Sequence, residues 1–99
     1  MIARMWHGIT PVDKADAYLE FLKQRAIPDY ESVPGNLSVH IMRDIQGDQA
    51  HFITLTFWES EAAIRQFAGD DILRAKYYPE DHDFLIEFEP MVKHYEVYP

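Results

Sequence analysis

The sequence predicts a single α+β domain in which four antiparallel strands form one sheet that carries helices on one face. Three observations lead to this prediction. The chain has 99 residues; short runs rich in β-branched and aromatic residues alternate with helical patterns; and turn signals separate these segments. A chain of this length fits one domain, residues 1–99, and leaves no room for a second core.

The first strand is expected over residues 2–8, an apolar and aromatic run too short for a helix. Thr10 and Pro11 are typical of a helix start, with a hydroxyl N-cap followed by proline at the first helical position. Apolar residues at helical spacing follow and define one buried face: Ala15, Tyr18, Leu19 and Leu22. This helix is expected to end before Pro28, because proline has no N–H to donate and restricts the residue before it.

A hairpin is expected in the middle of the chain. Pro34-Gly35-Asn36 predicts a turn, and residues 37–43 then alternate in the manner of a strand. Residues 44–49, centred on Gly47-Asp48, predict the hairpin loop. Residues 51–58 form the strongest strand pattern in the sequence, since they are rich in β-branched and aromatic side chains.

The last third of the chain repeats the helix and strand signals. Ser60 is expected to cap a helix that ends at Gly69, and a further short helix is expected over residues 70–76. An aromatic and acidic connection over 77–89 then leads to a fourth strand over 91–98. The order strand, helix, strand, strand, helix, strand is the ferredoxin-like pattern.

Both faces of the predicted sheet are apolar. In the strand over 51–58, Ile53, Leu55 and Phe57 point to one face, while Phe52 and Trp58 point to the other. Because helices cover only one face, and 47% of the residues are hydrophobic, the second face needs another cover. A second copy of the same sheet meets that need, so a homodimer is predicted.

Composition excludes several classes of protein. The net charge is −8, from 9 basic and 17 acidic residues, which disfavours nucleic acid and anionic membrane surfaces as partners. The absence of cysteine excludes disulfides and thiolate catalysis. No segment approaches the ~20 apolar residues of a membrane span, and the first residues lack the apolar core of a signal peptide. A cytoplasmic location is therefore expected.

Several segments together carry a family resemblance. They are the Pro34-Gly35-Asn36 turn, the Phe57-Trp58-Glu59-Ser60 junction, Ile64-x-x-Phe67-Ala68-Gly69, and Glu87-Phe88-Glu89-Pro90 followed by His94-Tyr95-Glu96-Val97. This combination, spread over essentially the whole chain, resembles antibiotic biosynthesis monooxygenase domains. The resemblance implies a dimeric α+β barrel with a ligand pocket between helices and sheet in each subunit. It also implies either cofactor-independent oxidation of aromatic substrates or haem degradation.

The resemblance speaks against haem degradation in this chain. Haem-degrading members are expected to carry an asparagine, a tryptophan and a histidine, and the matching positions here hold Trp6, Phe67 and Lys76. A protonated lysine is a poor ligand for haem iron. Haem binding would then need a nearby histidine, such as His82, to substitute.

Two histidines are candidate general bases. Trp6 and His7 face opposite sides of the first strand, so one of them should face the pocket, and a histidine there could take a proton near neutral pH. Alternatively, Trp6 fills the core and His7 bonds a carbonyl. His82 lies among acidic residues that favour its charged form. The alternative for its segment is a solvated acidic loop, and a metal site there is disfavoured because consecutive residues rarely converge on one ion.

Aromatic side chains are candidates for holding a flat ring, with plain core packing as the alternative. They are Trp6, Tyr18, Phe52, Trp58, Phe67, Tyr77 and Tyr78. The leading hypothesis is a cofactor-independent monooxygenase that acts on a small aromatic or quinol-like molecule, with His7 or His82 as the base. The alternative is a non-catalytic dimer that binds a small hydrophobic ligand.

Overall fold

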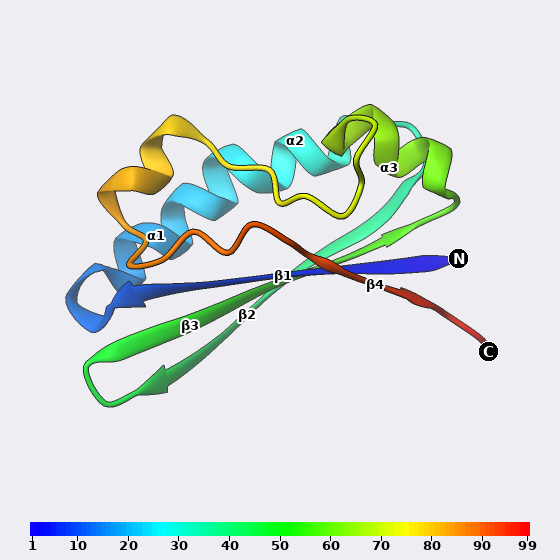
Figure 1. Ribbon diagram of the computed structural model, residues 1–99. Coiled ribbons are helices and arrows are strands. Elements are labelled where there is room, and N and C mark those ends of the chain that lie inside the picture. Colours follow the sequence, from blue (N-terminus) through cyan, green and yellow to red (C-terminus); the bar gives the residue numbers. More distant parts are fainter.

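The computed structural model describes all 99 residues and confirms the α+β, ferredoxin-like fold. The strands are β1 (Ile2–Pro11), β2 (Asn36–Gln46), β3 (Gln49–Trp58) and β4 (Lys93–Glu96). They form one antiparallel sheet in the order β2-β3-β1-β4. Figure 1 shows the helices together on one side of this sheet, with the other side bare.

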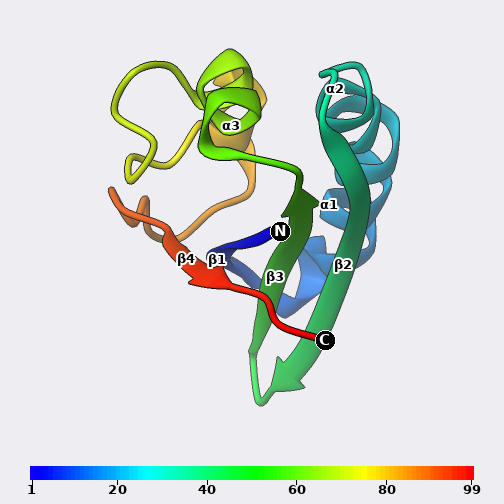
Figure 2. The same ribbon diagram turned by 90° about the vertical axis from the view of Figure 1, so that its right-hand side faces the viewer.

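The helical layer has two parts. The first runs through η1 (Val12–Lys14), α1 (Ala15–Phe21), the π-helical turn η2 (Leu22–Ala26) and α2 (Ile27–Glu31). The second holds α3 (Glu61–Ala68) and the short 3₁₀ helix η3 (Pro79–Asp83). Figure 2 shows the two parts side by side above the strands. None of these helices is long and apolar enough to cross a lipid bilayer.

The predicted turns and caps of the hairpin and of α3 are present. Gly47, with φ 62°, and Asp48 connect β2 to β3 in a two-residue hairpin. The side chain of Ser60 accepts a hydrogen bond from the backbone N–H of Ala63 and caps α3. Gly69 ends α3 with φ 89°, a conformation that glycine adopts without strain.

The prediction that a helix starts at Thr10 and Pro11 is wrong. Thr10 pairs with Ala50 and Pro11 with Gln49, so β1 extends to the tip of the β2-β3 hairpin. The hydroxyl of Thr10 donates to the carbonyl of Pro11 at 3.0 Å and caps no helix. The long hairpin offers β1 a partner strand, and this pairing outweighs the local cap signal.

The prediction that Pro28 stops the first helix is also wrong. At η2 the N–H of Ile27 donates to Leu22 O, five residues back, and α2 then continues to Glu31. Pro28 therefore falls in the first turn of a new α-helical segment, a position where proline is tolerated. The π turn is what lets the helix pass through the proline.

Residues 70–76 form no helix, contrary to the prediction. Their backbone pairs instead with the chain that leads into β4: Ala75 N–H donates to Pro90 O at 2.9 Å, and Val92 N–H donates to Leu73 O at 2.8 Å. Arg74 and Met91 form an isolated bridge. This pairing uses the donors and acceptors that a helix would need, and it shortens the predicted last strand to four residues.

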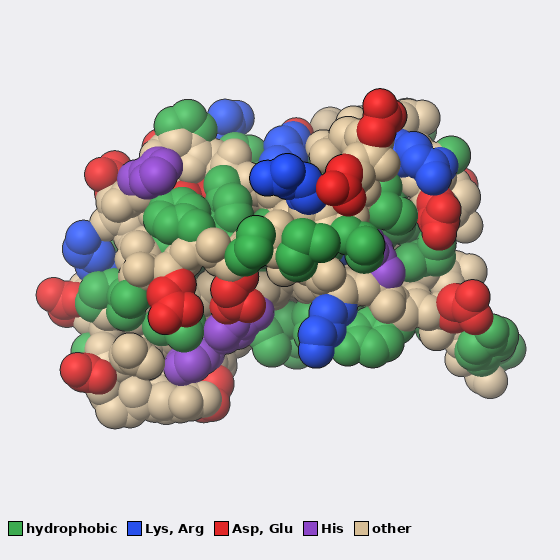
Figure 3. All heavy atoms as spheres, in the orientation of Figure 1, with side chains coloured by type: hydrophobic (Ala, Val, Ile, Leu, Met, Phe, Trp, Pro, Cys, Tyr) green, Lys and Arg blue, Asp and Glu red, His purple; other side chains and the backbone are tan.

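The core lies between the helices and one face of the sheet. Alternate residues of β3 are fully buried there, including Phe52 and Trp58. The residues between them, such as Ile53, Leu55 and Phe57, lie half-buried on the bare face. Figure 3 shows hydrophobic side chains crossing the middle of the visible surface, between the helical layer and the sheet. Both faces of the sheet are therefore apolar, as predicted.

Candidate functional site

A small cavity lies between the first helical part, the sheet and the segment that holds η3. Its lining comprises four aromatic, two aliphatic and three polar residues: Trp6, Tyr18, Leu22, Ala26, Tyr30, Thr54, Lys76, Tyr78 and Asp81. The centre of a water molecule can occupy only about 20 Å³ of it, which is room for one or two waters. An aromatic ligand therefore requires lining side chains to move apart.

Trp6 reaches the cavity because Gly8 leaves room for its indole ring. Trp6 lies on the helix-facing side of β1, as its burial and its pairing with Thr54 show. A Cβ atom at Gly8 would lie 2.3 Å from Cη2 of Trp6, closer than side-chain atoms ever approach. The Trp6-x-Gly8 spacing thus permits the indole ring to fold flat over the strand.

The first helical part contributes four residues at a strict spacing of four: Tyr18, Leu22, Ala26 and Tyr30. In an ideal α-helix each four-residue step turns about 40° past a full turn, so such a row drifts away from one face. The wider π turn η2 lies in the middle of this row and undoes part of that drift. The π turn thereby keeps all four side chains on the cavity.

Asp81 is the carboxyl group of the cavity. Its side chain is almost fully buried, and it accepts hydrogen bonds from the Tyr18 hydroxyl at 2.9 Å and from the Tyr78 N–H at 2.7 Å. Burial raises the pKa of Asp81 above its ordinary range, although these two hydrogen bonds act in the opposite direction. A carboxylate with a raised pKa is a better proton acceptor near neutral pH than an exposed one.

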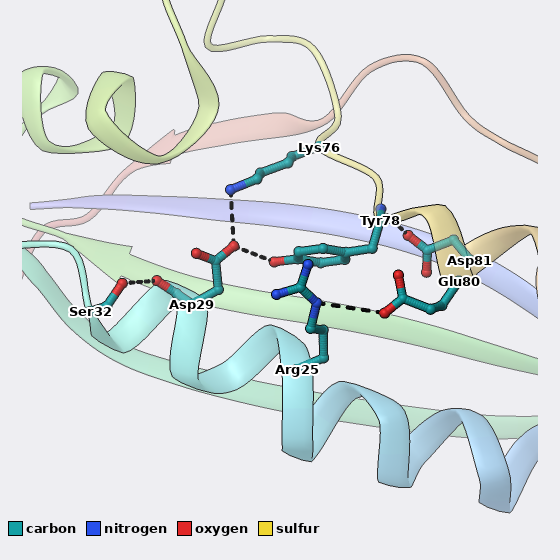
Figure 4. Close-up of polar contacts among 7 residues, drawn as sticks. All are labelled: Arg25, Asp29, Ser32, Lys76, Tyr78, Glu80 and Asp81. Atoms are coloured by element: carbon teal, nitrogen blue, oxygen red, sulfur yellow. Dashed lines mark hydrogen bonds and ion pairs between the residues drawn. The ribbon is translucent and has the colours of Figure 1, made fainter.

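Asp29 joins two parts of the cavity wall (Figure 4). Its Oδ2 atom accepts from Lys76 Nζ at 2.9 Å and from the Tyr78 hydroxyl; we name these three residues the Asp29 latch. Burial alone would raise the pKa of Asp29, but the hydrogen bonds from Tyr78 and Lys76 outweigh it and lower the pKa. The latch ties the start of the η3 segment to α2.

Arg25 reinforces the latch from outside. Its guanidinium carbon lies 4.9 Å from the centre of the Tyr78 ring, and its Nε lies 3.6 Å from a carboxylate oxygen of Glu80. The ring of Tyr78 is thus held between a cation and the cavity. Figure 4 shows the Tyr78 hydroxyl at Asp29 and the Tyr78 backbone N–H at Asp81, so hydrogen bonds hold this wall residue at both ends.

Three of the aromatic residues suggested by the sequence line the cavity, namely Trp6, Tyr18 and Tyr78. The other four pack behind the lining. Phe52 contacts Tyr18 edge-on at 5.1 Å between ring centres, and Phe67 stacks on Tyr30 at 4.2 Å. Trp58 packs on Phe67 at 5.8 Å, and Tyr77 packs edge-on against Trp6 at 6.2 Å.

Neither candidate histidine lines the cavity. His7 lies on the bare face of the sheet, where its Nδ1 atom bonds the carboxylate of Glu89 and its Nε2 atom lies 3.0 Å from Nδ1 of His51. His82 lies on η3 with its ring 4.6 Å from that of Phe88. Of the pair Trp6 and His7, it is therefore Trp6 that faces the cavity.

The sequence reasoning missed Tyr30 because it ended the helix before Pro28, and it left Ala26 out of the buried face although that residue lies inside the expected helix. The signal was present, since the four-residue spacing from Tyr18 continues through both. Asp81 was noted only as one of several acidic neighbours of His82. Its role depends on contacts with Tyr18, 63 positions away, which a single sequence does not reveal.

The lining residues do not fit a haem ligand set. No histidine lines the cavity, and the one amine, Lys76 Nζ, donates to the Asp29 carboxylate. A lysine held as a cation in this way cannot coordinate iron through its nitrogen lone pair.

This arrangement defines a class of protein: a ferredoxin-like domain with an aromatic cavity between its helices and one sheet face. The family model of antibiotic biosynthesis monooxygenase matches residues 5–75, and the chain belongs to that family. No curated protein matches the sequence significantly.

Solved structures show the same fold at low identity. The crystal structure of an antibiotic biosynthesis monooxygenase has a TM-score of 0.68 and 16% identity, with 100% of both chains covered. The haem-degrader MhuD from Mycobacterium tuberculosis has a TM-score of 0.65 and 20% identity, covering 98% of this chain and 95% of that one. A conserved protein from Methanosarcina mazei has a TM-score of 0.61 and 14% identity, covering 96% and 91%.

Proposed function

We propose that the protein binds a small aromatic molecule in this cavity and oxidises it with molecular oxygen without a bound cofactor. The observation that carries the proposal is a buried carboxylate of raised pKa, Asp81, within a lining of four aromatic rings. The rings suit a flat apolar ligand, and the carboxylate supplies a base in a cavity that excludes bulk water. Family membership supports the same reaction class.

The reaction balances without an added reductant when the substrate carries an activated CH₂ group. Asp81 removes one C–H proton, and the resulting carbanion passes one electron to oxygen. The carbon radical and superoxide combine to a peroxide anion, which takes the proton back from Asp81. The resulting hydroperoxide then loses water, which carries away the second hydrogen of the same carbon and leaves a carbonyl group. Overall, CH₂ and O₂ become C=O and H₂O. The base, orientation and desolvation are the protein's contributions.

Ligand access requires the cavity to open. The Asp29 latch holds one wall, and Asp29 and Lys76 keep 28% and 35% of their side-chain surface exposed. An ion pair that exposed is weak, so the latch can break at little cost. Its release would free Tyr78 to swing outward and enlarge the cavity.

The test is oxygen consumption with a panel of anthrones, which carry an activated CH₂ group. The wild-type protein should consume oxygen with these substrates, and Asp81→Asn should lower kcat by about 10²-fold or more, as expected for loss of a general base. His7→Gln and His82→Ala should retain turnover. If turnover were lost in either histidine variant and retained in Asp81→Asn, that histidine and not Asp81 would be the general base.

A second candidate function is ligand binding without chemistry. The same cavity favours it, because nothing in its lining demands turnover. In that case the panel compounds would raise the melting temperature of the protein without oxygen uptake. The two outcomes are distinguished in one set of samples.

We further propose that the bare sheet face pairs with a second copy of the chain. Met5, Ile53, Leu55 and Phe57 lie half-buried on this face, and Met42 remains 42% exposed. A sheet that is apolar on both faces needs cover on both, and an identical sheet is complementary to it.

A further inference from the structure

A buried arginine ties residues 70–76 to the sheet. Arg4 lies on the helix-facing side of β1 with 2% of its surface exposed, and no ion pair of the chain includes it. Its guanidinium donates instead to the carbonyl of Ile72 and, at 3.0 Å, to that of Arg74. The segment belongs to no helix or strand and has only an isolated bridge at Arg74. Its position therefore depends strongly on Arg4.

His94 is the third partner of Arg4. The two residues pair across β1 and β4, and Nη1 of Arg4 lies 3.0 Å from Nε2 of His94. A guanidinium has only donors, so Nε2 accepts, and the proton of the neutral ring is assigned to Nδ1. That Nδ1 atom is buried and has no hydrogen-bond partner. The contact exists only while His94 is neutral, because a protonated ring presents a donor where an acceptor is needed.

An acidic hollow beside His94 offers the protonated ring a second position. His94 forms part of the wall of this hollow, which has a volume of about 430 Å³. Burial lowers the pKa of His94, the charge of Arg4 lowers it further, and the charge of Glu61 acts in the opposite direction. A ring that gains a proton is repelled by Arg4 and attracted by carboxylates. The other titratable residues that line the hollow are Glu59, Glu61, Glu96, Tyr98 and the amino-terminal Met1.

We propose that His94 is a proton-controlled switch for the segment over residues 70–76. The neutral ring holds Arg4 against the carbonyls of this segment. The protonated ring turns away into the acidic hollow and leaves a buried donor of Arg4 without an acceptor, which costs free energy and loosens the segment. Lys76 of the Asp29 latch is the last residue of the segment, so acid should also ease ligand entry. Only this last consequence rests on the proposed function.

Amide hydrogen exchange without ligand tests the switch. A histidine with a lowered folded pKa binds fewer protons folded than unfolded. Its stabilising contribution is complete above the ordinary value of 6.5 and is lost as pH falls from there toward the folded pKa. The amides of Ala75 and Val92 bond the segment to the chain that leads into β4. Relative to intrinsic exchange, their protection should fall between about pH 7 and about pH 5, by up to about tenfold per pH unit.

His94→Gln should abolish this pH response. The glutamine side chain carries an oxygen that can accept from Arg4, and it does not titrate. His40→Gln is the matched control, because His40 is exposed on the bare sheet face beside the Ser38 hydroxyl; it should respond to pH like the wild type. Unchanged protection in the wild type, or an equal loss in the wild type and His94→Gln, would overturn the inference.

Nitrogen NMR of the wild-type imidazole keeps the inference falsifiable if His94→Gln does not fold. At neutral pH the ring of His94 should be neutral with its proton on Nδ1, and it should gain a second proton over the same pH range in which Ala75 and Val92 lose protection. A proton on Nε2 at neutral pH would overturn the inference. Association of an anthrone should become faster at acidic pH in the wild type and not in His94→Gln. Failure of the anthrone to bind at any pH would overturn the proposed function and leave the switch intact.

Discussion

The hydroxyl of Tyr18 donates to Oδ1 of Asp81 at 2.9 Å, joining α1 to η3 across the cavity. This contact tunes the carboxylate that the proposed reaction needs. Burial raises the pKa of Asp81, whereas the hydrogen bonds from Tyr78 and Tyr18 lower it. The contact also changes Tyr18, because the negative charge of Asp81 adds to burial in raising the pKa of the Tyr18 phenol. Substitutions at Asp81 and Asp29 test these charges separately.

The first prediction concerns the Asp81→Asn variant. A carboxyl group with a raised folded pKa binds more protons folded than unfolded, so its contribution to stability falls as pH rises from the ordinary value of 3.8 through the folded pKa. The amide of the variant does not titrate and has no such loss. The unfolding free energy of Asp81→Asn minus that of the wild type should rise with pH in this window, by at most about 1.4 kcal/mol per unit. Urea titrations at several pH values measure it, and a flat difference would contradict a raised pKa.

The second concerns Asp29→Asn, which weakens the Asp29 latch. The folded pKa of Asp29 is lowered, so its stabilising effect is present above 3.8 and is lost as pH falls through the folded pKa. Because the pair with Lys76 is partly exposed, the variant should lose less than about 1 kcal/mol at neutral pH. Urea unfolding at neutral pH measures this loss.

The same variant should admit ligand faster, with an increased association rate in stopped-flow binding. Asp16→Asn is the matched control, since Asp16 pairs with Arg43 at 2.8 Å away from the cavity. Its association rate should match the wild type. An unchanged rate in Asp29→Asn would mean that the latch does not limit access.

The sequence predicted the sheet, the hairpin and α3 well because their signals are local. Ser60, Gly47 and Gly69 each act through their own backbone or that of close neighbours. The local signals at Thr10 and Pro28 gave wrong predictions. Pairing with a strand distant in sequence overrode the cap signal at Thr10, and a π turn carried the helix past Pro28. In the site, strand alternation predicted that one of Trp6 and His7 faces the cavity but not which one. Asp81 and the latch depend on contacts between residues about fifty or more positions apart in the chain.

Gly8→Ala should displace the indole of Trp6, because the new Cβ would lie 2.3 Å from one ring carbon and 2.6 Å from another. Overpacking of this kind costs about 1–3 kcal/mol. In a Trp6→Leu background, which lacks the indole ring, Gly8→Ala should destabilise the protein much less. A double-mutant cycle by urea unfolding measures the coupling. Additive effects would show that the indole does not lie over Gly8.

Leu55→Asp should separate the proposed dimer. Leu55 lies on the bare sheet face, opposite Met5 and His40 on the neighbouring strands, and an aspartate there would be buried without a partner in a sheet-to-sheet interface. Sedimentation should change from twice the chain mass to the chain mass. Leu73→Asp, at a residue 48% exposed on the helical side, should leave the mass unchanged. A wild-type monomer at micromolar concentration would refute the dimer itself.

Pro28→Ala tests whether the π turn holds the cavity row together. Alanine restores the N–H that proline lacks, so the helix can revert to regular α-helical bonding and gain stability, by about 1 kcal/mol or more. Regular bonding would rotate Tyr18 and Leu22 relative to Ala26 and Tyr30 and misalign the lining. The expected result is therefore a higher melting temperature with weaker binding of aromatic probes. A variant that gains stability and keeps its affinity would show that the row needs no π turn.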